Sequence, residues 1–322
     1  MALTEASILV TGGTGSFGQR FVETVLARYR PRRLVVFSRD ELKQSEMQAR
    51  LTHPALRFFL GDVRDRERLV RAMYGVDIVV HAAALKQIPA CEYNPFEAIQ
   101  TNVMGGKNVI DAAIDAGVKR VIALSTDKAC NPVNLYGATK LCAEKLFVQA
   151  NTYGFPRGTS FSCVRYGNVI GSRGSVIPLF RQQSACGMVT VTDPKMTRFW
   201  ITLDQGVDFV LRCLELMHGG EIFVPKLPST RIMDLVEAVA PGCETTFVGI
   251  RPGEKLHEVL VTEDETRQAV DLPSMYVLEP ISPAWAYTRW TEGRRMASGA
   301  AYASDTNDDF LTPAEMRALI DG

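Results

Sequence analysis

Ile8-Leu9-Val10-Thr11-Gly12-Gly13-Thr14-Gly15-Ser16-Phe17-Gly18 is the stretch that decides the fold of this chain. It combines an apolar strand, a glycine-rich turn and the start of a helix. Gly12 permits a tight turn, Gly15 lets backbone amides approach a pyrophosphate, and Gly18 lets the helix pack closely on the strand. The spacing predicts a dinucleotide-binding turn, with a plain glycine-rich turn as the alternative. The expected cofactor-binding residues here are Gly12, Thr14, Gly15, Ser16, Phe17 and Gly18.

Outward from that turn, short β-branched runs alternate with longer amphipathic patterns. This alternation predicts a parallel sheet covered by helices on both faces, the doubly wound α/β class of Rossmann-type folds. The predicted strands are Ser7–Thr11, Arg33–Phe37, Arg57–Leu60, Asp77–His81, Arg120–Leu124 and Phe161–Arg165. The predicted helices are Ser16–Ala27, Glu41–Leu51, Arg66–Met73, Phe96–Ala116 and Leu135–Asn151.

After Arg165, Gly and Pro become frequent and the alternation breaks. A helical pattern returns at Leu203–Met217, and a β-α stretch follows at Glu221–Val239. We therefore expect a smaller, interleaved α/β domain for the substrate, separated from the first domain by a cleft because no polar linker lies between them. The expected boundaries are 1–167 with 199–224 for the Rossmann-type domain, and 168–198 with 225–322 for the substrate domain.

Composition excludes several classes of protein. The 36 Lys+Arg balance the 36 Asp+Glu, which argues against nucleic acid or an anionic membrane surface as the partner. No apolar run approaches the roughly 18 residues of a membrane span, and the N-terminus lacks the pattern of a signal peptide, so we expect a cytoplasmic protein. The 7 cysteines include no CxxC pair, and the 4 histidines lack metal-ligand spacing, so we expect reduced thiols and no metal.

The end of the second strand bears on the choice of cofactor. An acid about 20 residues after the glycines is typical of an NAD site. Here Ser38, Arg39 and Asp40 end the strand and Lys43 follows one turn later. Arg39 and Lys43 could pair with a 2′-phosphate, so we expect NADP rather than NAD. The alternative is that Asp40 binds the ribose and Arg39 faces solvent.

The ends of the next two strands supply further cofactor contacts. Asp62 could meet the adenine amino group while Val63 packs on the ring, although an Asp that caps the next helix is an equal alternative. Ala82 and Ala83 are small enough to leave room for a cofactor across the strand ends. His81 lies inside the strand, and we expect it to be a core residue.

The catalytic signal joins Leu124-Ser125-Thr126-Asp127-Lys128 to Tyr136 and Lys140. Tyr136 and Lys140 are four residues apart and share one helix face. The Lys140 ammonium and a nicotinamide cation would lower the pKa of Tyr136, which could then take a hydroxyl proton as hydride leaves the same carbon. Thr126 could bind the substrate hydroxyl, and Leu124 and Ser125 would line the cofactor.

Together these motifs identify the chain as a member of the extended short-chain dehydrogenases/reductases that act on nucleotide sugars. More narrowly, it resembles the inverting UDP-N-acetylglucosamine 4,6-dehydratases of the pseudaminic acid pathway, nearly end to end. The resemblance implies an NADP-dependent hydro-lyase acting on UDP-N-acetylglucosamine as a homo-oligomer. The stretches that carry it are Ser38–Glu46, Ala82–Lys86, Leu124–Lys128, Asn134–Lys140, Arg165–Gly174, Met196–Thr202 and Arg251–Glu258.

Asp127 and Lys128 distinguish the reactions of this family. Retaining dehydratases usually have Asp-Glu after the Thr, whereas inverting ones have Asp-Lys, as here. In the implied reaction C4 is oxidised, water is eliminated across C5 and C6, and hydride returns to C6. The resemblance makes Lys128 the base for the C5 proton and Asp127 the acid for the leaving oxygen. Lys128 must then be neutral, which we expect burial near other cations to favour; the alternative is a solvated Asp⁻–Lys⁺ pair.

The resemblance also implies the substrate-binding residues. Lys86 and Asn168 match positions that contact the nucleotide sugar, and Arg251 and Glu254 match the segment that binds uridine diphosphate. Arg251 could pair with the pyrophosphate, and Glu254 could bind a ribose hydroxyl. Arg198 is a further candidate, for which an interdomain salt bridge is the alternative.

Two other functions fit the same fold. A nucleotide-sugar 4-epimerase or reductase would not depend on Asp127 or Lys128. A non-catalytic NADP-sensing module would keep the glycine turn but would tend to lose Tyr136 and Lys140, both of which are present.

Overall fold

The computed structural model describes residues 3–171 and 175–321 of the chain. Ser172, Arg173 and Gly174, which end the stretch Arg165–Gly174, lie outside the described residues. Within the described part, no helix is both long enough and apolar enough to cross a membrane. The cysteines are all free thiols, and those at 91, 130, 163 and 213 are buried.

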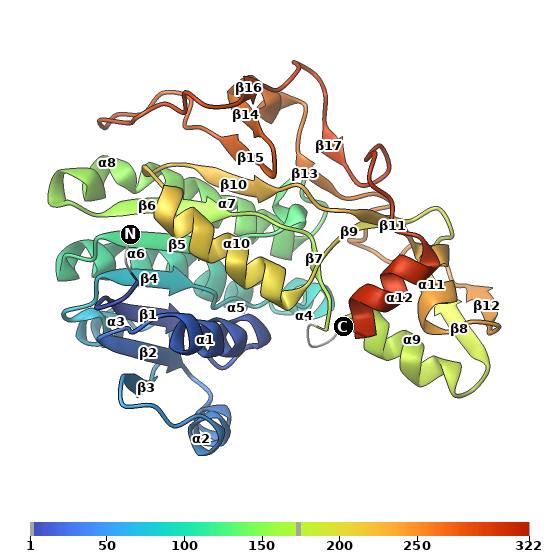
Figure 1. Ribbon diagram of the computed structural model, residues 1–322, viewed down its shortest axis with the longest axis horizontal. Coiled ribbons are helices and arrows are strands. Elements are labelled where there is room, and N and C mark those ends of the chain that lie inside the picture. The colour runs from blue at the N-terminus through green and yellow to red at the C-terminus, as the bar shows by residue number, and fades with distance from the viewer. Residues whose placement is uncertain (1–2, 172–174, 322) are drawn as a thin grey trace.

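A ten-stranded sheet forms the centre of the molecule, in the order β16-β14-β15-β10-β6-β5-β4-β1-β2-β3 (Figure 1). The strands from β10 to β3 run parallel, and β15, β14 and β16 are antiparallel at one edge. The strand order reverses between β1 and β4, where doubly wound sheets bind ligands. This confirms the predicted fold class. The bounds are β1 (Ser7–Thr11), β2 (Arg33–Ser38), β3 (Leu56–Leu60), β4 (Ile78–His81), β5 (Arg120–Leu124), β6 (Ser160–Val164), β10 (Ile222–Pro225), β14 (Ala269–Leu272), β15 (Met275–Leu278) and β16 (Arg294–Arg295).

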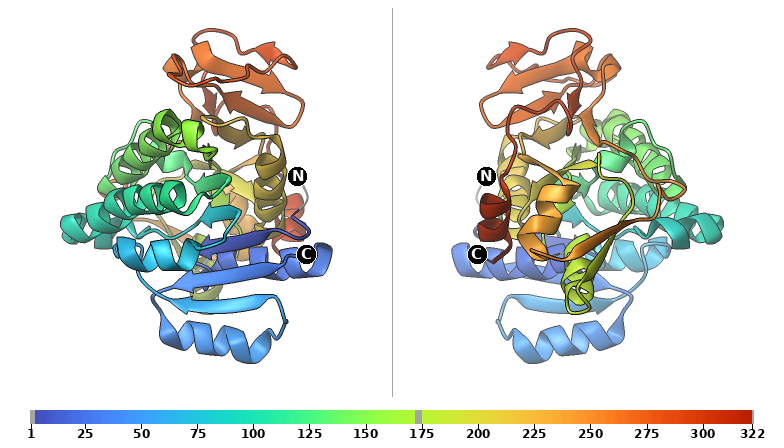
Figure 2. Two further views of the ribbon diagram at one scale, coloured as in Figure 1. Left: turned by 90° about the vertical axis from the view of Figure 1, so that its left-hand side faces the viewer. Right: turned by 90° about the vertical axis from the view of Figure 1, so that its right-hand side faces the viewer.

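Helices cover both faces of the parallel strands, as Figure 2 shows. α1 packs against α10 on one face, and α3, α6 and α7 pack together on the other. All residues of β1 and β4 are buried, as expected for strands covered on both faces. The helices are α1 (Ser16–Arg28), α2 (Glu41–Arg50), α3 (Arg66–Met73), α4 (Ile88–Tyr93), α5 (Pro95–Ile99), α6 (Gly105–Ala116), α7 (Leu135–Gln149), α8 (Asn151–Gly154) and α10 (Leu203–Leu216), with the 3₁₀ turns η2 (Asp127–Ala129) and η3 (Phe155–Arg157).

The predicted continuous helix Phe96–Ala116 is instead three segments. α5 and α6 are joined by a π-helical turn, η1 (Gln100–Met104). The turn includes the buried Asn102, whose side-chain amide accepts a hydrogen bond from the Leu85 N–H at 2.8 Å and donates one to the Leu85 carbonyl at 2.9 Å. These two bonds fix the loop that follows β4. π-Turns of this kind are frequent at functional sites.

A smaller lobe has a hydrophobic core of its own. Ile177 and Phe180 of α9 pack in it with Trp200 of β9, Leu235 of α11 and Met316 of α12. Reciprocal hydrogen bonds between Thr312 and Glu315 form a capping box at the start of α12. The elements on this side are β7 (Asn168–Val169), α9 (Val176–Ser184), β8 (Met188–Val191), β9 (Thr197–Ile201), β11 (Ser229–Arg231), α11 (Ile232–Val239), β12 (Glu244–Phe247), β13 (Val259–Val261), β17 (Tyr302–Ala303) and α12 (Pro313–Asp321).

The segment 269–295 does not follow the predicted domain boundary. We expected 225–322 to belong to the substrate domain, but β14, β15 and β16 extend the large sheet beyond β10. β15 pairs with β10, and Pro273 and Ser274 form the turn that leads from β14 to β15. The physical reason is that β10 would otherwise present an unpaired edge. The 3₁₀ turn η4 (Asp264–Gln268) precedes this segment.

Candidate active site

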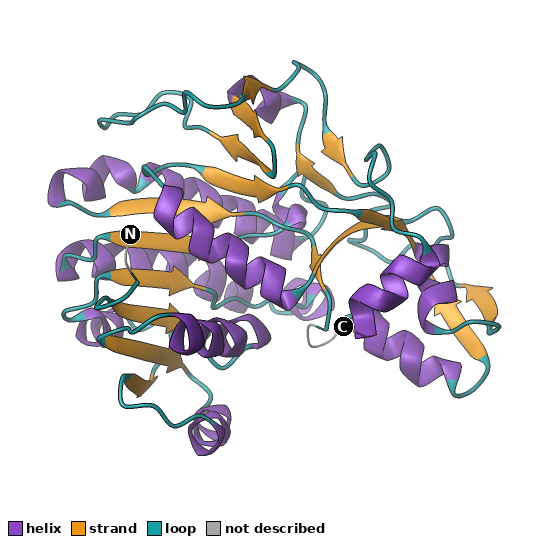
Figure 3. Ribbon diagram, in the orientation of Figure 1, coloured by secondary structure: helices purple, strands orange, loops and turns teal. Residues whose placement is uncertain are grey.

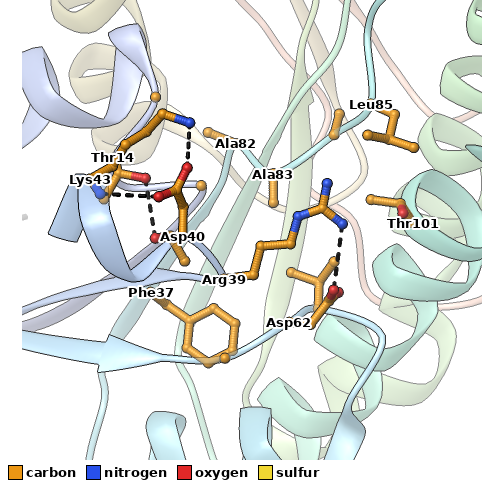
Figure 4. A pocket seen from close by; sticks show the side chains of 16 residues that line it. Thr14, Phe37, Arg39, Asp40, Lys43, Asp62, Ala82, Ala83, Leu85 and Thr101 are labelled. Atoms are coloured by element: carbon orange, nitrogen blue, oxygen red, sulfur yellow. Dashed lines mark hydrogen bonds and ion pairs between the residues drawn. The ribbon is translucent and has the colours of Figure 1, made fainter. Parts of the chain in front are cut away.

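A pocket is lined by residues at the carboxyl ends of β1, β2, β3 and β4. These strand ends point toward the smaller lobe, as Figure 3 shows. The pocket has a volume of about 290 Å³, and Figure 4 shows the side chains around it. The residues that line it are Gly12, Thr14, Gly15, Phe37, Ser38, Arg39, Asp40, Lys43, Gly61, Asp62, Val63, Ala82, Ala83, Ala84, Leu85 and Thr101. Most of the predicted cofactor-binding residues are therefore brought together. Ser16, Phe17, Gly18, Leu124, Ser125, Tyr136 and Lys140 are predicted contacts outside this lining.

The glycine turn makes backbone contacts that a side chain would block. Gly12 has φ +65°, and a Cβ there would lie 2.9 Å from the backbone of Ala82 and Ala83. A Cβ on Gly18 would lie 2.5 Å from the Gly13 Cα. Gly15 is the N-cap of α1, and no side chain caps this helix. The turn thus offers backbone N–H groups and a helix N-terminus to a pyrophosphate, so these residues fit a dinucleotide.

The part of the pocket that follows β2 and β3 carries two ion pairs. Arg39 lies 3.6 Å from Asp62, and Lys43 pairs with Asp40 (Figure 4). Asp40 also caps α2 by accepting the Lys43 N–H at 3.0 Å, so its carboxylate is already engaged. A 2′-phosphate contact by Arg39 and Lys43 is therefore favoured over a ribose contact by Asp40. Ser38 Oγ lies 3.1 Å from Thr14 Oγ1 and within the pocket.

Asp62 has more partners than the sequence suggested. It accepts hydrogen bonds from Arg64, and these outweigh the opposing effect of burial, so the pKa of Asp62 lies below its usual value. The N-cap of α3 is Asp65 and not Asp62. Val63 is buried beside Gly105, on the pocket wall. This leaves Asp62 as an ionised acceptor at the pocket edge.

His81 is a core residue, as predicted. Its Nδ1 lies 2.7 Å from Thr11 Oγ1, and it is buried between the β-strands. Burial, with a smaller contribution from Lys140, lowers the pKa of His81 to about 3. The imidazole is therefore neutral at physiological pH.

Tyr136 and Lys140 both lie on α7, but their relation differs from the prediction. Lys140 Nζ donates to the Leu124 carbonyl at 2.5 Å, and burial lowers the pKa of Lys140. Burial raises the pKa of Tyr136 to about 12, against a smaller lowering by the Lys128 charge and a hydrogen bond with Thr126. The expectation that Lys140 lowers this pKa is therefore wrong for the protein's own groups: the lysine that favours the phenolate is Lys128.

Lys128 lies among carboxylates. Its Nζ is 2.9 Å from Asp127 Oδ1, 3.3 Å from Glu258 Oε1 and 3.3 Å from Asn168 Oδ1. Burial lowers the pKa of Lys128, but Asp127 and Glu258 outweigh it and raise this pKa above its usual value. The expected neutral resting Lys128 is therefore wrong, because its charged neighbours include two carboxylates. The pair is also not solvated, since the Asp127 side chain is 0% exposed.

The backbone around this pair is closely packed. Thr126 is the N-cap of η2, and its hydroxyl lies 2.9 Å from Asp127 Oδ1. η2 packs against the first turn of α7, where a Cβ on Gly137 would lie 2.1 Å from the Lys128 carbonyl oxygen. Asn134, the N-cap of α7, accepts from the Gly137 N–H and donates to the Gly253 carbonyl, each at 2.8 Å. One side chain thus joins α7 to the segment 251–258.

The predicted substrate residues lie in different environments. Lys86 is exposed, and partial desolvation together with the Lys128 charge lowers its pKa. Arg198 donates to the carbonyls of Thr197, Lys255 and Leu256 and so holds the segment 251–258. These are backbone contacts within the predicted substrate domain and not the interdomain salt bridge given as the alternative. Arg251 is 60% exposed and lies 4.0 Å from Glu254.

Glu258 and Lys255 were missed by the sequence analysis. Both lie in the stretch Arg251–Glu258, but a Glu or Lys in a loop gives no sign of burial. Glu258 is 2% exposed, and Lys255 Nζ lies 3.6 Å from it. Among the described residues, no three His, Cys, Asp or Glu side chains form a group that could hold a metal.

Comparisons with known proteins place the chain in a family. Residues 8–280 match the model of the polysaccharide biosynthesis protein family. A Campylobacter jejuni protein named UDP-N-acetylglucosamine 4,6-dehydratase (inverting) is 48% identical, over 98% of this chain and 97% of its own length. The chain belongs to the polysaccharide biosynthesis protein family. Another relative, named UDP-glucose 4-epimerase, from Rickettsia conorii, is 45% identical over 98% of this chain and 95% of its own.

Solved structures agree with membership of the polysaccharide biosynthesis protein family. Pen from Bacillus thuringiensis has a TM-score of 0.90 and 39% identity, with 99% of each chain covered. DesIV from Streptomyces venezuelae, a dTDP-glucose 4,6-dehydratase with NAD and TYD bound, has a TM-score of 0.69 and 25% identity. That comparison covers 78% of this chain and 86% of DesIV. These similarities confirm the extended short-chain dehydrogenase/reductase fold.

Proposed function

We propose that this protein is a UDP-N-acetylglucosamine 4,6-dehydratase that inverts C5, a hydro-lyase using NADP. The observation that carries the proposal is the Asp127–Lys128 ion pair after β5, with Asp127 fully buried and with charges that act on Tyr136, in a chain 48% identical to an inverting dehydratase. A solved 4,6-dehydratase of the same fold binds NAD, which supports a nicotinamide cofactor here. The preference for NADP rests on Arg39, Lys43 and Ser38 at the adenosine end.

The glycine turn and the strand ends would hold this cofactor. Backbone amides from Gly12 to Phe17 would bind the pyrophosphate, and Asp62 and Val63 would contact the adenine. A bound nicotinamide would supply a hydride acceptor for C4 oxidation, a hydride donor for C6 and a positive charge at the site. Leu124, Ser125 and Lys140 would lie along the nicotinamide end.

Tyr136 and Thr126 would act on the 4-hydroxyl group of the sugar. Tyr136 takes the hydroxyl proton as C4 is oxidised, and Thr126 hydrogen-bonds the same oxygen. Because burial raises the pKa of Tyr136 to about 12, the protein alone keeps the phenol protonated at neutral pH. Lys128 partly offsets this effect, and the cofactor cation would have to supply the rest.

Asp127 and Lys128 would carry out the elimination. In the resting ion pair Lys128 holds the proton, and transfer of that proton along the 2.9 Å hydrogen bond gives a carboxylic acid and a neutral amine. Lys128 then takes the C5 proton, which the 4-keto group has acidified, while Asp127 protonates the C6 oxygen that leaves as water. This step restores the ion pair. The proton that returns to C5 comes from solvent and arrives on the opposite face, and Tyr136 releases to solvent the proton that it took from the 4-hydroxyl group.

The smaller lobe would bind the UDP-sugar. We propose Lys86 and Asn168 near the sugar, and Arg251 and Glu254 at the uridine diphosphate, with Arg198 holding their segment in place. The division into a Rossmann-type and a substrate domain, the homo-oligomer, the cytoplasmic location and the link to pseudaminic acid remain predictions.

A 4-epimerase is the second candidate, because a 45% identical relative carries that name. The two reactions share C4 oxidation, and they differ in whether water is lost. We favour the dehydratase because an epimerase needs no acid and base at C5 and C6, whereas the Asp127–Lys128 ion pair could supply both.

Mass spectrometry of the product tests this choice. With UDP-N-acetylglucosamine and catalytic NADP, we expect a product lighter by one water, and we expect Tyr136→Phe to form none while still binding the sugar nucleotide. A product of unchanged mass would favour the epimerase. Stoichiometric consumption of NADPH would indicate a reductase.

A further inference from the structure

Glu258 is a buried carboxylate surrounded by three cations. Its side chain is 3% exposed, and Lys128 Nζ lies 3.3 Å from Oε1. Lys255 Nζ lies 3.6 Å from Oε2 and Arg198 Nε lies 3.9 Å from Oε1. The Glu258 backbone is held by Ser304, which accepts its N–H at 2.9 Å and donates to its carbonyl at 2.8 Å.

The three cations are not equivalent. Arg198 donates to three backbone carbonyls, and Lys255 donates to the carbonyl of Cys130 at 2.5 Å. Their charges therefore hold the surrounding chain in place. Lys128 Nζ instead contacts three side-chain oxygens, those of Asp127, Asn168 and Glu258. In the proposed reaction, Lys128 is the cation of this cluster that loses and regains a proton.

We infer that Glu258 is a positioning residue that keeps a proton on Lys128 between turnovers and sets the pH at which this amine becomes a base for C5. The inference rests on the proposed function, since it requires Lys128 to remove the C5 proton. In the proposed reaction, Lys128 lies between Glu258 and the C5 atom of the sugar. Glu258 acts through charge, not through contact with the sugar.

The electrostatics follow from the groups that face Lys128. A carboxylate within about 4 Å favours the ammonium form, so both Asp127 and Glu258 stabilise Lys128 as a cation. Lys86, Arg198 and Lys255 oppose them, and Tyr136 carries no charge while protonated. His257, the neighbour of Glu258, is engaged by Thr197 at 2.9 Å and faces Asp305. Burial limits screening by solvent, which makes the Glu258 charge effective.

Removing that charge has two opposite consequences. Lys128 would give up its proton more readily, both to Asp127 and to solvent, so the fraction of neutral amine at a given pH would increase. The amine would also be a weaker base, so the rate at high pH, where all of it is neutral, would fall. A residue that only holds the loop would lower the rate at every pH and leave the midpoint of the profile in place.

The experiment measures deuterium entry at C5 against pH in D₂O, for the wild-type holoenzyme, Glu258→Gln and Glu258→Asp. We expect the midpoint of the rising limb to move down by about one to three pH units in Glu258→Gln. We expect a smaller shift in Glu258→Asp, because the shorter side chain keeps the negative charge but places it further from Lys128. The plateau should fall several-fold in the Gln variant.

Circular dichroism and cofactor titration establish that each variant is folded. If the Gln variant does not fold, the comparison of wild type with Glu258→Asp decides. One midpoint shared by the folded proteins would overturn the role of Glu258 while leaving the proposed function intact. Absence of C5 exchange in the wild type would instead overturn the proposed function itself.

Discussion

At the scale of single residues, Arg39 is the basis of the proposed preference for NADP. Its guanidinium is 54% exposed and lies 3.6 Å from Asp62. We expect Arg39→Ala to weaken NADP binding about tenfold or more, because a hydrogen bond to a charged group contributes about 1.5–3 kcal/mol. NAD lacks the 2′-phosphate, so its affinity should change little. Fluorescence titration with both cofactors measures this.

Arg50→Ala is the matched control for Arg39→Ala. Arg50 is on α2 with a similar exposure of 56%, and it pairs with Glu23 outside the pocket. It should leave both affinities unchanged. Equal loss of NAD and NADP affinity in Arg39→Ala would mean that Arg39 does not face the 2′ position.

The buried His81 makes the free energy of unfolding of this protein depend on pH. Its pKa is about 3 in the fold and about 6.5 in an unfolded chain, so the unfolded state binds the proton more strongly between these values. The His81 contribution is therefore complete above pH 6.5 and is lost as the pH falls toward 3, by about 1.4 kcal/mol per pH unit. In urea unfolding, His81→Gln should be less stable at pH 7 but should lose less stability between pH 6.5 and 4.5. Parallel losses in both proteins would contradict the neutral buried imidazole.

At the scale of elements, the contact between η2 and α7 sets the distance between Lys128 and Tyr136. A Cβ on Gly137 would lie 2.1 Å from the Lys128 carbonyl, so the two backbones must separate in Gly137→Ala. We expect a loss of stability of about 1–3 kcal/mol and a larger than tenfold loss of turnover.

Gly206→Ala provides the control for that substitution. Gly206 also lies near the start of a helix, α10, but its Cβ would have no atom closer than 3.9 Å. Ala should there stabilise the protein by about 0.5–1 kcal/mol. Thermal unfolding and turnover are measured for both variants, and normal turnover in Gly137→Ala would argue against this packing.

The elements that sequence periodicity predicts well are those with a buried face and a clear end. α3 and β5 have the predicted bounds, and α1 and α2 differ by one residue at their C-terminal ends. η1 was not predicted, because the π-turn leaves the spacing of the apolar residues almost unchanged. It is associated with the hydrogen bonds between the Asn102 side chain and the Leu85 backbone, which no local pattern reveals. α4 was missed because it spans only six residues.

At the scale of the whole molecule, the residues that were missed act across long sequence separations. The large sheet is completed by β14 to β16, whose pairing with β10 is not encoded in any local pattern. In the same way, Glu258 reaches Lys128 from a segment 130 residues further along the chain, where only the fold shows that the two charges meet. The glycine turn, Tyr136 and the Asp127–Lys128 pair could be found because each is a local motif.

Turnover of UDP-N-acetylglucosamine in D₂O, followed by NMR at C5 and by absorbance of the reduced cofactor, examines the chemistry of that pair. The wild type should release one water and give a product with deuterium at C5 and inverted configuration. Lys128→Met should still reduce the bound cofactor in part, but it should incorporate no deuterium at C5 and release no water. The surface variant Lys107→Met, which removes a 50% exposed lysine, should behave as the wild type. Retained C5 configuration, or normal C5 deuteration in Lys128→Met, would contradict an inverting dehydratase with Lys128 as its base.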